Sequence, residues 1–433
     1  METSIEEFRK LGLSENILKV IAELGFKEPS EIQKKAIPLV IEGKDVIGGS
    51  ATGSGKTLAF AAGIIQHSEA RQGIQALILT PTRELAEQVG KTFRKFAKHY
   101  ILTVAEVYGG VGIEPQIEAL KKAEIVVGTP GRILDHLERG TIELHKVRTL
   151  VLDEADRMLD MGFIDDVEKI INHCKNRKQT LLFSATINAD IERIAERYMK
   201  DVANIEAESY VDASKLKQVW YDVQQNVKFS LLVHLLRQEK AGLVMVFCNT
   251  RENSDFIAQN LKRYKLHALA IHGGLSQNKR TNVMEQFKHG EVYILVCTDV
   301  AARGLDIKGV SHVYNYDIPK TDDEYIHRIG RTARAGKEGI AVSLVSSRDY
   351  DNFRRVMENP DLKIEQIEVP QMEFVRPFFG QREERFDRRG FGRERRFAGR
   401  GSKGFGGGRF SGRSGGRYQR RQGSFTRRGF GRR

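Results

Sequence analysis

The chain has 433 residues, with 70 Lys and Arg against 57 Asp and Glu, so its formal net charge is +13. This length predicts two or three domains of roughly 100–200 residues each, and no apolar run approaches the ~18 residues of a membrane span. The three cysteines lie far apart, which excludes a disulfide framework and a thiolate metal cage. The chain starts with an acidic, polar segment unlike a targeting peptide, so we expect a cytoplasmic protein.

Short apolar runs typical of buried strands alternate with longer stretches of helical periodicity. The expected strands are 76–80, 125–127, 150–152, 180–183, 243–247, 269–271, 294–296 and 340–344, and the expected helices include 84–98 and 276–288. Strands that alternate with helices indicate parallel sheets covered on both faces. The number of strands fits two α/β domains better than one, and the polar interval 207–217 is expected to link them.

The positive charge is concentrated at the end of the chain. Residues 376–433 hold 18 Arg and one Lys against four acidic residues, a net charge of +15, whereas residues 1–375 carry a net charge of −2. With 15 Gly, ten aromatic residues and almost no aliphatic ones, this segment cannot bury enough apolar surface to fold, so we expect 368–433 to be a disordered tail. Arginines interleaved with aromatic residues favour binding of single-stranded nucleic acid. A solubilising appendage and a non-specific polycation are the alternatives.

A glycine-rich segment after Asp45-Val46-Ile47 predicts a phosphate site. Residues 50–57 read SATGSGKT, which is the P-loop pattern GxxxxGK[ST] with Ser50 in place of the first glycine. The backbone N–H groups of such a loop surround phosphate oxygens at a helix N-terminus. Lys56 can reach the β- and γ-phosphates, and the Thr57 hydroxyl can bind Mg²⁺.

Carboxylates follow directly after one of the expected strands. Residues 150–152 lead into Asp153-Glu154-Ala155-Asp156, and ligands of open α/β sheets bind at the carboxyl ends of the strands. Asp153 suits direct or water-mediated contact with Mg²⁺, and Glu154 can orient and deprotonate an attacking water. A glycine-rich turn and a helix cap are the alternatives for each motif alone. Both motifs in one domain predict nucleotide hydrolysis.

The tetrad at 153–156 is the signature of the DEAD-box RNA helicases, and the chain resembles this family over about residues 5–365. Other family blocks occur in the family's order: GFKEPSEIQ (25–33), PTRELA (81–86), GG (109–110), TPGR (129–132), SAT (184–186), VFCNTR (246–251), QNKR (277–280), TDVAARGLDI (298–307) and HRIGRTAR (327–334). Ser30, Ser50 and Ala333 depart from the usual Thr, Ala and Gly, and each exchanges one small residue for another. The resemblance implies two tandem RecA-like domains, at 1–206 and 218–367, each a parallel sheet with helices on both faces.

The resemblance also assigns residues to an ATP site. Phe26, with Phe8 as its upstream aromatic partner, would pack against adenine, and Gln33 would hydrogen-bond the base edge and select ATP. Arg331 and Arg334 would reach the γ-phosphate from the second domain as arginine fingers, although their spacing alone is typical of a solvated helix face. The remaining phosphate and ribose contacts would come from Thr52, Gly53, Ser54, Gly55, Gly304 and Asp306.

An RNA surface is implied on the opposite lip of the cleft between the domains. It would consist of short polar side chains, glycines and arginines, namely Thr82, Arg83, Gly110, Thr129, Arg132, Thr250, Arg251, Gly274, Gln277, Arg280 and Thr298. Such groups grip phosphate and 2′-hydroxyl groups and do not read bases, so binding is expected to be independent of sequence. Ser184, Thr186, Asp156 and His327 are expected to couple this surface to the ATP site.

Together these assignments predict RNA-stimulated ATP hydrolysis, with Mg²⁺, coupled to domain closure, local separation of short RNA duplexes and remodelling of RNA or RNP particles. An RNA chaperone with RNP or ribosome-assembly partners is consistent with this. An ATP-gated RNA clamp or scaffold is the main alternative, and a DNA helicase of related build is a weaker one. The intact Glu154, Arg331 and Arg334 favour turnover. Without heptads or an obvious exposed apolar stripe, we expect a monomer.

Overall fold

A computed structural model describes residues 2–49, 54–206, 216–238, 242–302, 307, 309–333 and 338–378. Most of the predicted linker and all of the chain after Phe378 lie outside these residues. None of the described helices is long and apolar enough to cross a membrane.

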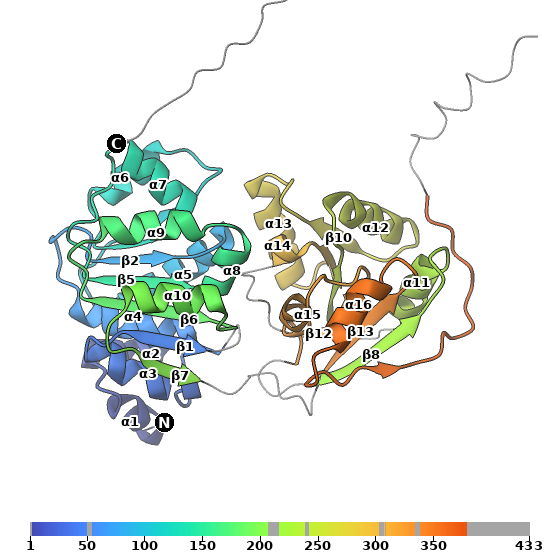
Figure 1. Cartoon of the computed structure of the whole chain (residues 1–433), viewed down its shortest axis with the longest axis horizontal. Coiled ribbons are helices and arrows are strands. Elements are labelled where there is room, and N and C mark those ends of the chain that lie inside the picture. The colour runs from blue at the N-terminus through green and yellow to red at the C-terminus, as the bar shows by residue number, and fades with distance from the viewer. Residues whose placement is uncertain are drawn as a thin grey trace, which may run out of the picture. The chain divides into compact units, whose positions relative to one another are not determined.

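Two seven-stranded parallel sheets organise the described chain (Figure 1). The first has the order β3-β4-β2-β5-β6-β1-β7 and the second β10-β11-β9-β12-β13-β8-β14. Numbered from its own first strand, each sheet has the same order, so one doubly wound topology occurs twice. The first sheet contains β1 (Val46–Gly49), β2 (Ala76–Leu79), β3 (Val104–Val107), β4 (Ile125–Gly128), β5 (Thr149–Asp153), β6 (Gln179–Ser184) and β7 (Ala203–Glu206). The prediction of parallel α/β sheets is confirmed.

Strands of the first sheet are apolar throughout because both faces are covered. In β2, Ala76 and Ile78 join the core on one face, and Leu77 and Leu79 join the core on the other. The first core is completed by α1 (Glu2–Arg9), α2 (Glu15–Glu23), α3 (Glu31–Ile41), α4 (Lys56–His67) and α5 (Arg83–Phe96). The second is completed by α6 (Glu114–Leu120), α7 (Pro130–Glu138), α8 (Ala155–Asp160), α9 (Ile164–His173) and α10 (Ala189–Tyr198).

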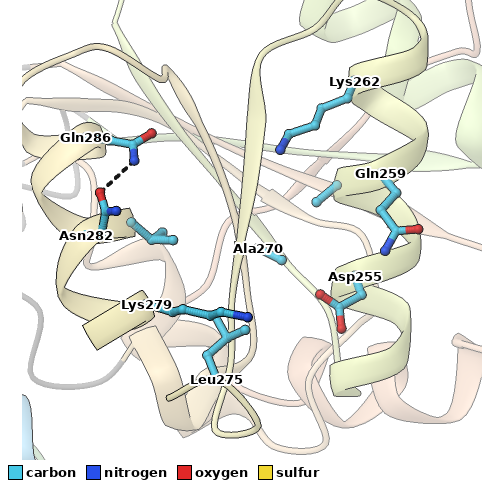
Figure 2. A pocket seen from close by; sticks show the side chains of 10 residues that line it. Asp255, Gln259, Lys262, Ala270, Leu275, Lys279, Asn282 and Gln286 are labelled. Carbon is cyan, nitrogen blue, oxygen red and sulfur yellow. Dashed lines mark hydrogen bonds between the residues drawn. The ribbon is translucent and has the colours of Figure 1, made fainter. Parts of the chain in front are cut away.

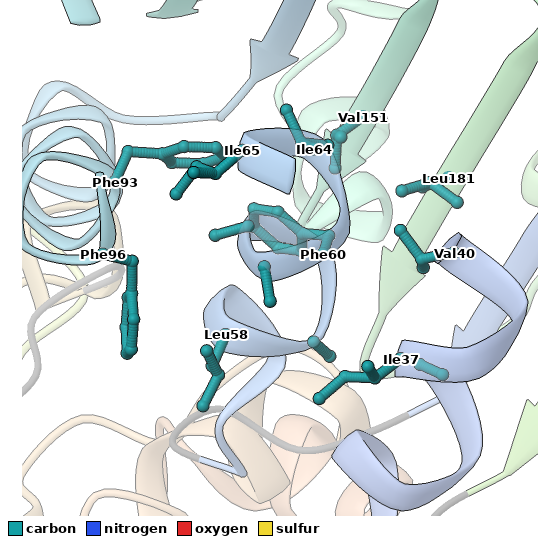
Figure 3. Packing of buried hydrophobic residues seen from close by; sticks show 14 of the residues in the cluster. Ile37, Val40, Leu58, Phe60, Ile64, Ile65, Phe93, Phe96, Val151 and Leu181 are labelled. Carbon is teal, nitrogen blue, oxygen red and sulfur yellow. The ribbon is translucent and has the colours of Figure 1, made fainter. Parts of the chain in front are cut away.

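Helix α4, which follows the glycine-rich loop, is buried along most of its length. Phe60 lies at its centre, with ring centroids 6.0 Å from Phe93 of α5 and 5.3 Å from Phe183 of β6. Figure 3 shows this ring among aliphatic side chains of the helices and the sheet, with Val151 and Leu181 on the strands. Because closely packed side chains resist displacement, this packing fixes the N-terminus of α4 relative to the sheet.

The second sheet contains β8 (Leu216–Asp222), β9 (Leu243–Phe247), β10 (Ala268–Ile271), β11 (Ile294–Cys297), β12 (Val310–Asn315), β13 (Gly339–Val345) and β14 (Glu365–Gln366). Helices α11 (Lys228–Gln238) and α12 (Arg251–Arg263) supply one of its cores. The helices of its other cores are α13 (Gln277–Lys288), α14 (Asp299–Ala302), α15 (Asp322–Ile329) and α16 (Tyr350–Met357).

Two boundaries differ from the sequence analysis. Strand β8 begins at Leu216, inside the predicted linker, because this leucine is buried in the second lobe. Residues 367–378, mostly assigned above to the disordered tail, run as an extended strap along α11 and α12 (Figure 1). Val375 is buried there, and its backbone N–H and C=O both bond the Ser230 hydroxyl. The packed part of the chain therefore reaches Phe378.

Candidate functional site

The glycine-rich loop ends in a left-handed turn that starts α4. Gly55 is the N-cap of α4 and has a φ of 90°. A Cβ atom there would lie 2.3 Å from Nε2 of Gln33, so both the backbone angle and the space require glycine. Ser54 and Lys56 on either side are buried, and Thr57 follows on the first turn of α4. Thr52 and Gly53 lie outside the described residues.

The start of α3 is bonded to this loop. Gln33 accepts a hydrogen bond from the Ser30 N–H (3.0 Å) and donates from Nε2 to the Gly55 carbonyl (3.1 Å), while the Ser30 hydroxyl donates to the Ser54 carbonyl (2.7 Å). Gln33 therefore caps α3 and also holds the loop, whereas the resemblance assigned it to the adenine edge. Its contact with adenine stays a prediction.

Phe26 presents a partly exposed ring supported by other aromatic rings. Its centroid lies 6.4 Å from Phe8 in a T-shaped arrangement and 6.2 Å from Phe96. Phe8 is fully buried, whereas Phe26 is 38% exposed. A flat apolar face held in this way suits stacking on a planar base.

Two buried carboxylates lie at the carboxyl end of β5. Asp153 is the last residue of the strand, and Glu154, with a left-handed φ of 52°, is the N-cap of α8. Burial raises the pKa of Asp153 to about 7; the charge of Lys56 lowers it and that of Glu154 raises it further. Among the described residues Oε2 of Glu154 is buried without a hydrogen-bond partner. An acceptor oxygen of this kind is available for a bound water or ligand.

Asp156 connects the acidic segment to the end of β6. Its Oδ2 accepts from the backbone N–H groups of Ala185 (3.1 Å) and Thr186 (3.2 Å) and from the Thr186 hydroxyl (3.3 Å). The Ser184 hydroxyl accepts from the Asp156 N–H (3.2 Å) and donates to the Thr186 carbonyl (2.7 Å). Nε2 of His327, on α15 of the second lobe, lies 3.9 Å from Oδ2 of Asp156. All four residues predicted to couple the sites therefore gather around one carboxylate.

Arginines from the second lobe line a small cavity with α8. Arg331 is buried and lines it with Arg157 and His327. Arg328, one turn earlier, is a structural residue: it bonds Asp299 through two nitrogens at 2.6 and 2.7 Å and Asn249 at 2.9 Å. Arg334, Gly304 and Asp306 lie outside the described residues.

A cavity of about 450 Å³ brings much of the predicted RNA surface together. Thr82, Arg83, Thr129 and Arg132 line it from the first lobe, and Arg280 lines it from the second. Gly110 belongs to the same group, because its φ is 85° and a Cβ atom there would lie only 1.8 Å from Nη1 of Arg83.

The other second-lobe members of the predicted surface lie at helix starts or beside the cavity. Thr250 caps α12 by accepting from the Asn253 N–H (3.1 Å), and Arg251 borders Gly273, a lining residue, and Gly274. Thr298 directly precedes α14 and accepts from the backbone N–H groups of Ala301 and Ala302 with its carbonyl.

Sequence reasoning missed a contact between the two lobes on this surface. Oε1 of Glu84 on α5 lies 3.0 Å from Nη2 of Arg280 and accepts a hydrogen bond from Nε2 of Gln277 at 3.3 Å. Both members of the ion pair are nearly buried. Opposite charges in the PTRELA and QNKR blocks were the only available signal. Arg157, whose Nη2 is buried without a partner among the described residues, was also missed.

The acidic site suits a hard divalent cation. Mg²⁺ is commonly bound by one or two carboxylates together with substrate phosphates and waters, and Asp153 and Thr57 supply oxygen donors of this type. The buried, unpartnered oxygen of Glu154 adds another nearby acceptor. Within the described ranges no cluster of three or more His, Cys, Asp or Glu could hold a metal.

Comparison with known sequences gives a consistent result. The family profile "DEAD/DEAH box helicase" matches residues 30–194, and "Helicase conserved C-terminal domain" matches residues 227–336. The DEAD-box ATP-dependent RNA helicase CshA of Geobacillus kaustophilus is 45% identical over 369 residues, which cover 84% of this chain and 79% of that relative. CshA of Bacillus subtilis is 43% identical, and the match covers 84% of this chain and 75% of that relative.

Solved structures of RNA-bound proteins share the fold. Dbp5 of S. cerevisiae bound to RNA and ADP BeF3 is 31% identical, with a TM-score of 0.77, over 84% of this chain and 96% of that one. The DEAD-box helicase Mss116 bound to ssRNA and UDP-BeF is 30% identical, with a TM-score of 0.77, and the match covers 86% of this chain and 81% of that one. The repeated sheet order, the P-loop helix and the acidic strand end define an ATP hydrolase of two tandem RecA-like domains. The chain belongs to the DEAD-box family of ATP-dependent RNA helicases.

Proposed function

We propose that this enzyme hydrolyses ATP in response to single-stranded RNA and uses the accompanying domain closure to separate short RNA duplexes locally and remodel RNA or RNP particles. The observation that carries the proposal is the division of the site between the lobes: Lys56, Asp153 and Glu154 belong to one lobe and Arg331 to the other. The contacts Asp156–His327 and Glu84–Arg280 each join a residue of the first lobe to one of the second.

In this proposal the nucleotide is held by groups from both lobes. Phe26 and Gln33 bind adenine, the loop 50–57 and Lys56 bind the phosphates, and Glu154 orients and deprotonates the attacking water. Thr57 and Asp153 would hold Mg²⁺, which would neutralise charge on the phosphate oxygens. The arginine fingers Arg331 and Arg334 stabilise the charge that develops on the γ-phosphoryl group, an effect of about 10³–10⁵ in rate. Asp306 and Gly304 complete the ribose contact.

RNA binding is proposed along the lip formed by Thr82, Arg83, Thr129, Arg132 and Arg280 and their neighbours. Because this set consists of phosphate-binding and hydroxyl-binding groups, affinity should depend little on sequence. ATP and RNA would both favour the closed arrangement, so each would tighten the binding of the other by the same factor. Closure would bend the bound strand and exclude its complement, and hydrolysis would reopen the lobes.

Three measurements test the proposal. ATP turnover should rise strongly when single-stranded RNA is added, and equal turnover with and without RNA would contradict it. Release of the short strand of an RNA duplex should require ATP or a non-hydrolysable analogue to close the lobes, and only ATP should support repeated rounds. RNA-dependent retention without strand release in ATP would instead identify an ATP-gated clamp. A competing DNA strand of the same sequence tests the preference for RNA.

A further inference from the structure

A second cavity lies on the second lobe, away from the ATP-site residues described above. It has a volume of about 300 Å³ and is bounded by α12, α13 and β10, one of the two edge strands of the second sheet. Figure 2 shows Lys262 on α12 and Lys279 on α13 directed from opposite helices toward the space beside Ala270.

The polar groups of this cavity suit an anion that also accepts hydrogen bonds. Besides the two lysines, Gln259, Asn282 and Gln286 line it, and Nε2 of Gln286 donates to Oδ1 of Asn282 at 2.7 Å. Asp255 is the one acidic lining residue, and its Oδ1 lies 3.0 Å from Nε2 of His272. The ion pairs of the described residues include neither lysine. Two ammonium groups are thus available to a ligand, and the neighbouring side-chain amides can donate further hydrogen bonds to it.

The cavity continues from the proposed RNA lip. Leu275 lines both cavities, and Lys279 lies next to Arg280, which faces the first cavity from the same helix. The first turns of α13 therefore present cations to two adjoining spaces. A strand held at the lip would need to travel only across Leu275 to reach Lys279.

The strap brings the start of the basic tail to α12. Asn260 accepts from the Phe378 N–H (2.6 Å) and donates to its carbonyl (3.3 Å), the Tyr264 hydroxyl donates to the Arg376 carbonyl (2.6 Å), and the Arg263 guanidinium lies 4.5 Å from the Phe378 ring centroid. Gln259 and Lys262 of the same helix line the cavity. The chain thus enters its Arg-rich segment from the helix that forms one wall of the cavity.

We propose that this cavity binds backbone phosphates of single-stranded RNA that extends beyond the lip, with Lys262 and Lys279 as the phosphate contacts. The proposal rests on the proposed function, and it adds an RNA contact beside the proposed RNA lip. Because the groups are ammonium ions and amides, they would grip the backbone of any sequence.

The test compares two oligouridylates on the full-length protein. One is just long enough to saturate RNA-stimulated ATP turnover. The other has the same sequence with a single-stranded extension, placed at the 5′ end in one version and at the 3′ end in another. Lys262→Gln with Lys279→Gln should reduce the affinity gained from one of the extensions and lower the salt slope for that RNA by about 1.4, or about 0.7 for each lost phosphate contact. Lys288→Gln with Lys363→Gln, two exposed lysines of the same lobe, removes the same charge and should leave the gain intact.

An extension with a neutral methylphosphonate backbone should add no affinity through these lysines. Equal gains from charged and neutral extensions, or the same gain in the cavity variant and its control, would overturn the proposal. So would equal losses with the short and the extended RNA, because they would indicate a general defect of the second lobe. Turnover of the unchanged protein with the short oligouridylate reports separately on the proposed function.

Discussion

Glu154 combines three properties at one residue. Its backbone is left-handed, which costs a non-glycine residue roughly 1–3 kcal/mol, its side chain is buried, and Oε2 has no hydrogen-bond partner among the described residues. Such a residue is maintained against its own conformational preference by the strand before it and the helix after it. Strain and an available buried acceptor are together typical of a group used in chemistry.

Changing Glu154 to Gln should abolish most ATP turnover while RNA and ATP still bind. The amide keeps the shape of the side chain but cannot accept a proton, and general-base catalysis contributes about 10²–10⁴ in rate. Steady-state phosphate release measures the loss, and nucleotide binding is measured separately. Glu192→Gln on α10 makes the same change at an exposed position and should have no effect. Turnover near that of the control would rule out the assigned role.

The Glu84–Arg280 ion pair should couple the lobes energetically. Glu84→Gln and Arg280→Gln each break the same contact, so the double variant should lose less RNA affinity than the sum of the single losses, with a coupling of about 0.5–3 kcal/mol. The readout is the RNA concentration for half-maximal stimulation of ATP turnover. The pair Arg94 and Glu106 lies within the first lobe, and the same cycle there should give no coupling. Additive losses at 84 and 280 would contradict the prediction.

At the scale of elements, most strands that sequence analysis found are short apolar runs, whereas the largely buried β1 and β12 were not found. β2, β4, β9 and β11 are short apolar runs with every or nearly every residue buried, and such runs are visible without tertiary information. β8 was missed because exposed Lys217 and Asp222 interrupt its buried residues. β14 has only two residues, both exposed, so no apolar pattern marks it in the sequence.

The same distinction applies to the candidate site. Contiguous blocks such as 153–156 and 184–186 were found because their spacing is local, and the structure brings them together at neighbouring strand ends. Glu84 and Arg280 are distant in the sequence, and no local pattern pairs them. Gln33 was assigned to a base, whereas its bond to the Gly55 carbonyl appears only when the fold places α3 beside the loop.

Helices α11 and α16 are joined by a buried ion pair, which gives a stability prediction. Nζ of Lys228 lies 2.6 Å from Oδ2 of Asp349, which also accepts from the N–H and hydroxyl of Ser346. Lys228→Met leaves the carboxylate without its cation, so we expect the second lobe to lose about 3–5 kcal/mol of unfolding free energy. The ring of Trp220, the single tryptophan, packs against that of Phe353 on α16, with ring centroids 4.8 Å apart. Its fluorescence therefore reports urea unfolding of this lobe.

The control and the rescue sharpen this experiment. Lys363→Met, at an exposed position of the same lobe, should change the unfolding free energy by no more than about 0.5 kcal/mol. Adding Asp349→Leu to Lys228→Met should recover part of the stability, because it removes the isolated charge. Equal midpoints for Lys228→Met and Lys363→Met would show that the pair does not hold the two helices.

For the whole molecule, the charge distribution predicts that catalysis and retention of RNA belong to different parts of the chain. The net charge of residues 1–375 is −2 and that of residues 376–433 is +15, so the net positive charge of the chain lies in its last segment. A core of this kind grips RNA through a few placed groups, whereas a segment rich in Arg and aromatic residues adds affinity that depends on salt and little on sequence. The strap contacts through Phe378 mark where the chain can be cut without disturbing the second lobe.

Deleting residues 379–433 should weaken RNA binding and flatten its salt dependence, since each single-strand phosphate neutralised adds about 0.7 to the slope. ATP saturation should barely change, and strand separation should become less processive over repeated encounters.

Replacing the tail's Phe and Tyr by Ala while keeping every Arg should preserve the salt slope and still lower RNA affinity, because stacking is lost and charge is not. Deleting 367–433 should in addition destabilise the second lobe, because Val375 and its bonds to Ser230 are removed. An unchanged salt slope after truncation at Phe378 would show that the core alone sets the electrostatic grip on RNA.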